Sequence, residues 1–597
     1  MVINIKYKCN YKNASESNVL FRLLKNRGVE KPQEYCNLTS ECLIDYNKLD
    51  NMQSACKMLD HHICNDSKIA ILVDEDVDGF TSASVMFNYL GEIYKRDKLE
   101  YIIHKRAKSH GLTEDVIVND DVDLLIIPDA GSSNVHECKL LKDKGIDVII
   151  LDHHECSVKN DYAIVVNNML SKDYSNKNLS GVGVVYKFCQ ALDEYYMEES
   201  ADKFIDLVAL GLIGDMMDIK SYETKYLIDK GLNNITNKFL IALINKQEFV
   251  MNGIISIRNF QFSIVPLINA MIRVGSLEEK ELVFKAMINE YEEFEYESKT
   301  KGTIMENIYD RGARLCSNAK SRHDNKAKKE MKILSSIIDL EENETNECII
   351  VDGTETVDNA LTGVTAMKIA SKYKKPCILL NLRETRVING NPVKIYGGSA
   401  RNQNNSTFKE LKNVVASTGC FSLAEGHQGA FGVEISEDMI ENAREKLNEI
   451  LGKIPKENEY SVDFELAECE LDAGFVQEID LFRSYIGQGI NETLVKCDLS
   501  LNKSNCDLMG KNKDSISYMS DTGVKYVMFS CNDQNELLQW MKSDNNAIEI
   551  EVVGKPSINI YQGIATPQFI IEDFNVLNIS NTTENDDDIW EDGDDIW

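Results

Sequence analysis

The sequence VDEDVDGFTS at residues 73–82 places three aspartates at alternate positions just before a glycine. They are Asp74, Asp76 and Asp78. The apolar run at residues 69–74 has the pattern of a buried strand, and residues 82–94 have that of a helix. An EF-hand calcium loop also starts with alternating aspartates, but it requires glutamate at position 12, where this chain has Val85. The segment therefore predicts a strand, an acidic turn and a helix. Solvated loop carboxylates are the alternative if the segment is taken alone.

Three further apolar runs in the first half of the chain are typical of buried parallel strands. They are residues 124–129 (LLIIPD), 148–153 (VIILDH) and 164–167 (IVVN). Helix-like segments separate them, and this alternation predicts a doubly wound, mostly parallel α/β sheet. Because ligands bind beyond the carboxyl ends of such strands, polar residues at those ends are candidates for chemistry.

Aspartates and histidines stand at the predicted strand ends. Asp129 closes one strand, His153 and His154 follow another, and Asp215 follows an apolar helix. Carboxylates gathered at one sheet edge repel one another unless cations neutralise them. Carboxylates and imidazoles without thiolates suit Mn²⁺ or Mg²⁺, and two such ions bridged by one aspartate would support phosphoryl chemistry.

Together these motifs resemble the four motifs of the DHH phosphoesterase superfamily. The chain resembles the RecJ family, which are single-strand-specific 5′→3′ exonucleases, over nearly its whole length. Further matching segments are residues 180–183 (SGVG), 262–273 (FSIVPLINAMIR), 397–401 (GGSAR), 426–432 (GHQGAFG), 486–492 (IGQGINE) and 557–563 (SINIYQG). Segments 397–401 and 426–432 are similar to the substrate loops of the DHH-associated (DHHA1) domain, and the last two to the family's OB-fold.

The resemblance implies roles for matching residues. Asp74 and Asp129 would hold one Mn²⁺ or Mg²⁺ ion, and Asp76, Asp129, His153 and Asp215 would hold the other.

The other implied roles concern the substrate and the motif around the metals. His154 would contact the scissile phosphate, and Asp78 would order its loop rather than bind metal. Leu72 stands where some branches place a histidine, which would leave the first metal site one imidazole poorer. The phosphates of the substrate strand would be bound by Asn269, Arg273, Ser399, Arg401 and His427.

The expected fold class is α/β with a C-terminal β-barrel. The expected units are an N-terminal extension (1–50), a DHH catalytic domain (51–280), a long helical linker (281–340), a smaller α/β DHHA1 domain (341–455), an OB-fold that binds nucleic acid (456–580) and a disordered acidic tail (581–597). An OB-fold grips single strands through a basic groove and stacked aromatic rings.

Charge and composition limit the function further. The net charge of −32 argues against a nucleic-acid partner at face value, but two basic islands stand out. Residues 371–413 carry nine Lys and Arg against two acids, and residues 299–332 carry ten against four. These islands are compatible with a groove for a polyanion, although either alone is typical of a solvated helix face. None of the sixteen Cys forms a C-x-x-C pair, which argues against a zinc ribbon or a thioredoxin-type motif. Since MVINIKYKCN has no apolar signal-peptide region, we expect reduced thiols in an unexported protein.

The resemblance implies a metal-dependent exonuclease that degrades single-stranded DNA in recombination, repair or replication. Two alternatives are a phosphodiesterase of short oligonucleotides or cyclic dinucleotides and a non-catalytic replication scaffold. We expect a bacterial cytoplasmic protein, or a host-cytoplasmic one if a phage encodes it, with no membrane partner. Residues 584–597 repeat an acidic Asp-Asp-Ile-Trp pattern, which is compatible with docking to a single-strand-binding protein or a helicase; a solubilising acidic tail is the alternative.

Overall fold

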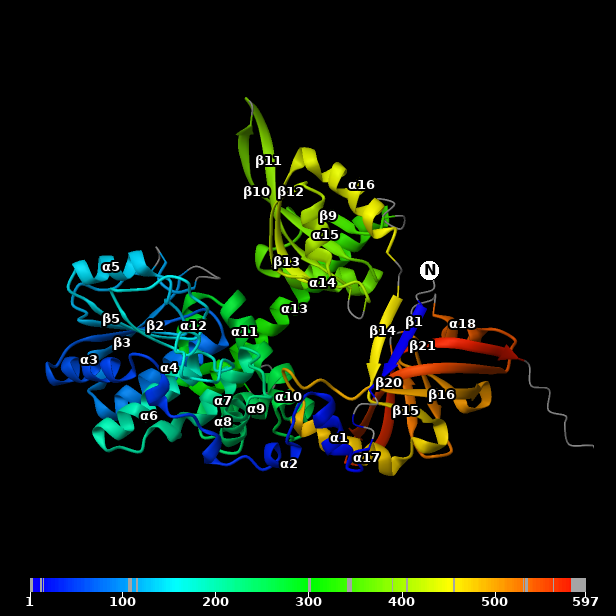
Figure 1. Ribbon diagram of the computed structural model, residues 1–597, viewed down its shortest axis with the longest axis horizontal. Coiled ribbons are helices and arrows are strands. Elements are labelled where there is room, and N and C mark those ends of the chain that lie inside the picture. The colour runs from blue at the N-terminus through cyan, green and yellow to red at the C-terminus, as the bar shows by residue number, and fades with distance from the viewer. Residues whose placement is uncertain are drawn as a thin grey trace, which may run out of the picture.

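The computed structural model describes residues 4–10, 13, 15–105, 110–113, 116–298, 302–340, 346–388, 390–403, 406–454, 457–529, 531, 535–561 and 563–580 (Figure 1). The predicted acidic tail, 581–597, lies outside these residues. Within the part of the chain that is described, no helix combines the length and the apolar character needed to cross a membrane.

A five-stranded parallel sheet forms the centre of the first domain, as predicted. Its strand order is β3-β2-β4-β5-β6, and every neighbouring pair is parallel. The strands are β2 (Ile69–Val73), β3 (Leu99–Ile103), β4 (Leu124–Pro128), β5 (Asp147–Asp152) and β6 (Ile164–Asn167). β3 lies at the sheet edge and was not among the predicted strands. Helices of the first domain are α3 (Met52–Cys64), α4 (Val77–Ile93), α5 (Val135–Asp143), α6 (Gly181–Tyr196) and α7 (Ile205–Gly214).

A helical layer follows the sheet in the chain. It contains α8 (Tyr222–Leu232), α9 (Lys238–Met251), α10 (Ile257–Asn259), the π-helical turn η6 (Phe260–Ile264), α11 (Val265–Val274) and α12 (Leu277–Met287). η6 continues directly into α11, so residues 260–274 form one uninterrupted helical segment.

The predicted helical linker (281–340) is wrong between residues 293 and 307. Residues there form an antiparallel hairpin of β7 (Glu293–Ser298) and β8 (Gly302–Asn307). Alternating side chains explain the hairpin, because Phe294 and Tyr296 point to one face and pack under arginines of the next helix. The Arg311 guanidinium lies 4.3 Å from the Phe294 ring centre, and that of Arg314 lies 4.0 Å from the Tyr296 ring centre.

The long helix α13 (Ile308–Leu340) joins two hydrophobic cores, in agreement with the predicted connecting helix. Near its start, Ala313 and Cys316 are buried in the core of the first domain. Towards its end, Ala327, Leu334 and Ile338 are buried in the core of the second domain. The helix is thus packed at both ends rather than being a free spacer.

The second domain is a smaller α/β unit, as predicted. Its sheet has the order β12-β13-β11-β10-β9, with only the β9–β10 pair parallel among the described strands. Its elements are β9 (Ile349–Asp352), α14 (Thr362–Tyr373), β10 (Cys377–Ile388), β11 (Asn391–Arg401), α15 (Leu411–Ser417), β12 (Phe421–His427), β13 (Ala430–Ser436) and α16 (Ile440–Leu451).

The third domain contains a seven-stranded sheet in the order β15-β16-β20-β21-β19-β18-β17. Its elements are β14 (Glu457–Val462), β15 (Phe464–Ala467), α17 (Ala473–Leu481), β16 (Val495–Asn502), β17 (Cys506–Met509), β18 (Ser515–Met519), β19 (Lys525–Met528), α18 (Glu536–Lys542), β20 (Ala547–Tyr561) and β21 (Ile564–Ser580). The strands confirm a β-rich unit, while its assignment as an OB-fold stays a prediction.

The N-terminal segment connects the first and third domains. It contains β1 (Asn4–Cys9), α1 (Val19–Asn26) and α2 (Pro32–Tyr35). β1 pairs in parallel with β14, so the two lie side by side in Figure 1. Arg27 forms a short ion pair with the buried Asp463, with 2.5 Å between Nη1 and Oδ1. The N-terminal segment therefore packs against the third domain.

Candidate metal centre

The predicted metal ligands converge at the carboxyl edge of the parallel sheet. Three groups of side chains each offer ligand atoms within 4.8 Å of one another. The groups are Asp74, Asp76 and Asp129; Asp78, His153 and Asp215; and Asp129, His153 and His154. Asp129 and His153 each belong to two groups, so the three groups form one continuous centre. The structure thus brings together all six predicted catalytic residues.

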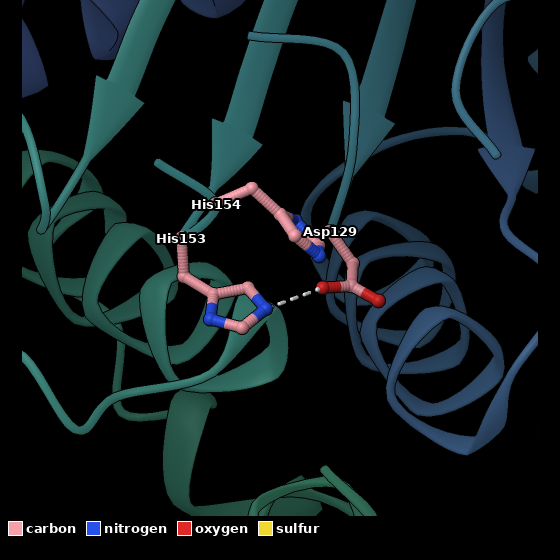
Figure 2. Close-up of side chains that lie close together, drawn as sticks. All are labelled: Asp129, His153 and His154. Atoms are coloured by element: carbon pink, nitrogen blue, oxygen red, sulfur yellow. Dashed lines mark ion pairs between the residues drawn. The ribbon is translucent and has the colours of Figure 1, made fainter. Parts of the chain in front are cut away.

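Asp129 and His153 face each other at the middle of this centre (Figure 2). Asp129 Oδ1 lies 3.2 Å from His153 Nε2, and the same nitrogen lies 3.4 Å from Asp215 Oδ2. Asp129 Oδ1 and His153 Nε2 are buried and make no hydrogen bond among the described residues. Buried polar atoms are normally satisfied, and a cation between such atoms would satisfy both.

The backbone at Asp129 is held in an unusual conformation. Its φ of 63° is in the left-handed region, which is uncommon for a residue other than glycine. The N-terminus of α6 packs directly over it, because a Cβ atom on Gly181 would lie 2.4 Å from Asp129 Oδ1. This contact explains why the small-residue segment 180–183 needs a glycine, and strain of this kind is often found at functional sites.

Asp74 is surrounded by hydrogen-bond donors that the sequence prediction missed. Its Oδ2 lies 2.7 Å from His110 Nδ1, and its Oδ1 accepts a 2.8 Å hydrogen bond from the Gly111 N–H. His104 Nε2 lies 3.6 Å from Asp74 Oδ1. Burial raises the pKa of Asp74, but the nearby His104 ring and the hydrogen bond with His110 outweigh it and lower that pKa overall.

The expectation that Leu72 leaves the first metal site one imidazole poorer stays a prediction, because His104 and His110 contact the Asp74 carboxylate and belong to none of the three ligand groups. Leu72 is buried in β2, and both histidines approach Asp74 from the segment that follows β3. The sequence does place His104 and His110 after the run LEYII at 99–103. That run is short and contains a glutamate, so it was not recognised as a strand and the two histidines were not recognised as strand-end residues.

Asp78 and Asp76 have separate structural roles in addition to their place in the centre. Asp78 Oδ1 accepts hydrogen bonds from Ser180 Oγ at 2.9 Å and from the Val182 N–H at 3.2 Å, which agrees with its predicted role of ordering the motif. Its Oδ2 is buried without a hydrogen bond, and Asp78 belongs to the group with His153 and Asp215. Asp76 caps α4 by accepting from the Gly79 N–H at 2.8 Å.

His154 is positioned by Asp152, the buried aspartate that precedes the two histidines. Asp152 Oδ1 lies 2.8 Å from His154 Nδ1 and accepts from the His153 N–H at 2.7 Å. The hydrogen bond to Asp152 raises the pKa of His154 to about 9. His154 is therefore a cation at neutral pH, and nearly half of its side chain is exposed.

The carboxylates of the centre are electrostatically crowded. Burial, followed by repulsion from Asp78, raises the pKa of Asp76 to about 6 and that of Asp215 to about 8. The same causes raise the pKa of Asp129 well above its ordinary value. Charged oxygens that repel one another, together with buried unpaired atoms, are what a divalent cation relieves. The residues present thus fit a divalent metal.

The predicted phosphate-binding residues occur in two separate places. Asn269 and Arg273 lie on α11, which packs near α4 and α7 of the first domain. Ser399 and Arg401 lie on β11, and His427 ends β12. Strand register places Arg401 and His427 in one row across the second-domain sheet, each opposite Ala430 of β13.

A turn of the third domain docks beside the metal centre. The Ile219 N–H donates to the Gln488 carbonyl at 3.0 Å, four residues after Asp215. Gly489 has a φ of +83°, and a Cβ there would meet the Asp218 carboxylate at 2.0 Å. The glycines of segment 486–492 therefore allow a close contact between two domains.

Comparisons with known proteins agree with this geometry. Residues 68–212 match the family model described as the DHH family, N-terminal domain. The chain is 36% identical to a putative SPbeta prophage-derived single-strand DNA-specific exonuclease, YorK, of Bacillus subtilis, over 94% of this chain and 96% of that protein. It is 24% identical to the single-stranded-DNA-specific exonuclease RecJ of B. subtilis, over 92% of this chain and 67% of that protein. The crystal structure of Thermus thermophilus RecJ in complex with Mn²⁺ superposes with a TM-score of 0.69 at 16% identity, covering 97% of this chain and 80% of that one.

Proposed function

The chain belongs to the RecJ-like family of DHH-domain, single-strand DNA-specific exonucleases, and we propose that it degrades single-stranded DNA from the 5′ end to nucleotides by two-metal hydrolysis. The convergence of Asp74, Asp76, Asp129, His153 and Asp215 at one sheet edge carries this proposal. A scaffold protein derived from this fold has no need of such a set, and every predicted ligand is present.

Two sets of ligands, which are those implied by the family resemblance, would hold the two ions. Asp74 and Asp129 would hold one Mn²⁺ or Mg²⁺, and Asp76, Asp129, His153 and Asp215 the other. Asp129 would belong to both sets, and its position supports this, because it lies within ligand distance of Asp74 and Asp76 on one side and of His153 on the other. When bound, such ions supply Lewis acidity and lower the pKa of a coordinated water.

The protein residues around the ions orient the reacting strand. His154 is a cation at neutral pH and stands at the accessible side of the centre, so it would contact the scissile phosphate. Asp152 fixes the direction of its ring through Nδ1, which leaves Nε2 for the phosphate. Asn269 and Arg273 on α11, with Ser399, Arg401 and His427 of the second domain, would bind further phosphates of the same strand.

Polarity and substrate size are tested together. A strand labelled at its 5′ end, its copy labelled at the 3′ end and a blunt duplex are incubated with the full-length protein and Mn²⁺. Immediate release of labelled mononucleotide from the 5′-labelled strand alone is the expected result. Cleavage confined to di- to pentanucleotides or cyclic dinucleotides would instead identify a small-substrate phosphodiesterase.

We further propose that residues 584–597 dock a single-strand-binding protein or helicase during recombination, repair or replication. The support is their sequence, in which eight acids accompany two of the three Trp in the chain. Deletion of these residues is expected to abolish partner binding in a pull-down with purified proteins while hydrolysis of naked DNA persists. Unchanged partner binding would refute this docking role.

A further inference from the structure

The helical segment formed by η6 and α11 exposes one row of side chains. On α11, Pro266, Asn269 and Arg273 are accessible, whereas the residues between them are buried. Phe262, four residues before Pro266 on the π-helical turn η6, is exposed as well and extends this accessible side of the segment. At 1.5 Å per residue the row is about 16 Å long. An aromatic ring thus lies in line with the two residues proposed to bind phosphate.

Phe262 is exposed although it belongs to a well-packed segment. Its exposed fraction is 66%, while Phe260, two residues earlier, is fully buried. The Arg258 guanidinium lies 5.7 Å from the ring centre of Phe262 and forms a 2.6 Å ion pair with Glu492 of the third domain. π-helical turns are rare in proteins, and those that occur often lie at functional sites. The ring is therefore held in place at the surface rather than packed into a core.

Phe262 is one residue away from a contact with the segment that follows Asp215. Its neighbour Gln261 contacts Met216 Sδ through Nε2 at 2.9 Å, and Met216 follows Asp215 directly. A small apolar crevice here is lined by Met216, Met217, Ile219, Ile257, Gln261 and Gln488. Gln488 comes from the third domain, so the crevice lies where that domain meets the metal centre.

We propose that Phe262 is a stacking platform for one nucleobase of the DNA strand whose phosphates are bound by Asn269 and Arg273. This inference rests on the proposed function and adds a base-binding subsite to it. Every base has a π face, so stacking on an aromatic ring tolerates any sequence. A base inside a duplex is already paired and stacked between its neighbours, so the platform favours unpaired strands.

The stacking role is tested by a cycle, called here the base-deletion cycle, that removes the ring from the protein and the bases from the DNA, separately and together. Full-length wild type, Phe262→Ala, Phe262→Leu and Phe262→Tyr are compared by fluorescence anisotropy in Ca²⁺ on a 5′-phosphorylated, 12-nucleotide thymidine strand. The same strand built of abasic residues is the second ligand. Loss of the ring is expected to weaken binding of the thymidine strand roughly five- to hundredfold. Tyr should preserve binding, and neither Ala nor Leu should weaken binding of the abasic strand.

The matched control is Phe249→Ala, because Phe249 is 89% exposed but lies on α9, outside the row. It should bind both strands as the wild type does. Equal weakening of both strands by Phe262→Ala, or no weakening at all, would overturn the stacking role.

A separate readout keeps this inference distinct from the proposed function. Wild-type protein is tested for hydrolysis of the thymidine strand in Mn²⁺ with the same preparation. If the wild type hydrolyses it and the base-deletion cycle shows no coupling, the platform is wrong and the exonuclease assignment stands. If the wild type shows no hydrolysis of any single strand, the proposed function itself fails.

Discussion

His110 Nδ1 lies 2.7 Å from Asp74 Oδ2, and this contact joins a histidine beyond the edge strand β3 to the first aspartate of the acidic motif. The His110 ring is also 4.6 Å from that of His154, at a steep angle. One side chain thus connects a proposed metal ligand with the proposed phosphate-contacting residue. Partners that orient metal ligands in this way tune metal affinity.

Replacement of His110 by alanine is expected to weaken Mn²⁺ binding by roughly 10- to 100-fold, because Asp74 loses the donor that orients its carboxylate. Isothermal titration calorimetry on the full-length protein measures the change. His136→Ala, on the exposed face of α5, is the control. An unchanged Mn²⁺ affinity in His110→Ala would show that the contact does not serve the metal.

Asp129→Asn is expected to lower DNA hydrolysis about a thousandfold or more while binding of single-stranded DNA in Ca²⁺ is retained, since the shared ligand is lost. Asparagine tolerates the left-handed backbone conformation at this position, so the fold is preserved. In EDTA the variant should melt at a higher temperature than the wild type, because a buried and repelled charge has been removed. Asp120→Asn, on an almost fully exposed side chain, should change neither property.

Metal-free stability is expected to fall as pH rises from about 4 to 8. The pKa values of Asp76 and Asp215 are raised to about 6 and about 8 in the folded protein, so the folded chain binds more protons than the unfolded chain across this range. Bound Mn²⁺ should reverse the trend, because the ligands must lose their protons to bind it. At a hundredfold excess over Kd the metal adds about 2.7 kcal/mol.

Melting curves at pH 5, 6, 7 and 8, with EDTA or with Mn²⁺, test this pH dependence. The shift in melting temperature caused by Mn²⁺ should grow with pH. A shift that is constant from pH 5 to 8 would mean that these carboxylates do not change protonation when metal binds.

Asp152→Asn is expected to reduce hydrolysis most strongly between pH 7 and 9. The wild-type His154 stays protonated up to a pKa of about 9 because Asp152 accepts its Nδ1–H, and the variant would return that pKa towards the ordinary value of about 6.5. The pH at which the hydrolysis rate declines on the alkaline side should fall by roughly two units. Asp147→Asn, at the other end of the same strand, is the control. An unmoved alkaline limb would show that His154 is not the titrating group.

Much of the metal centre was predictable because of a local property of parallel sheets. Asp129, His153 and His154 each follow a strand, and all parallel strands end at the same edge, so strand order alone brings them together. The alternating aspartates after β2 reach that edge for the same reason. For each of these residues, the apolar run, the end of the strand and the polar residue that follows it lie within about a dozen residues and can be recognised together.

The remaining features depend on contacts between residues far apart in the chain, and only the tertiary structure decided them. His110 reaches Asp74 because β3 pairs beside β2, although LEYII at 99–103 is a weak strand signal. In the hairpin at 293–307, two arginines of α13 lie over the rings of Phe294 and Tyr296, a contact between separate elements that the acidic run by itself does not indicate. The third domain meets the centre through Gln488 and Ile219, whose contact depends on how two separate folding units pack. Local patterning thus determined the ligand set, whereas long-range packing decided what surrounds it.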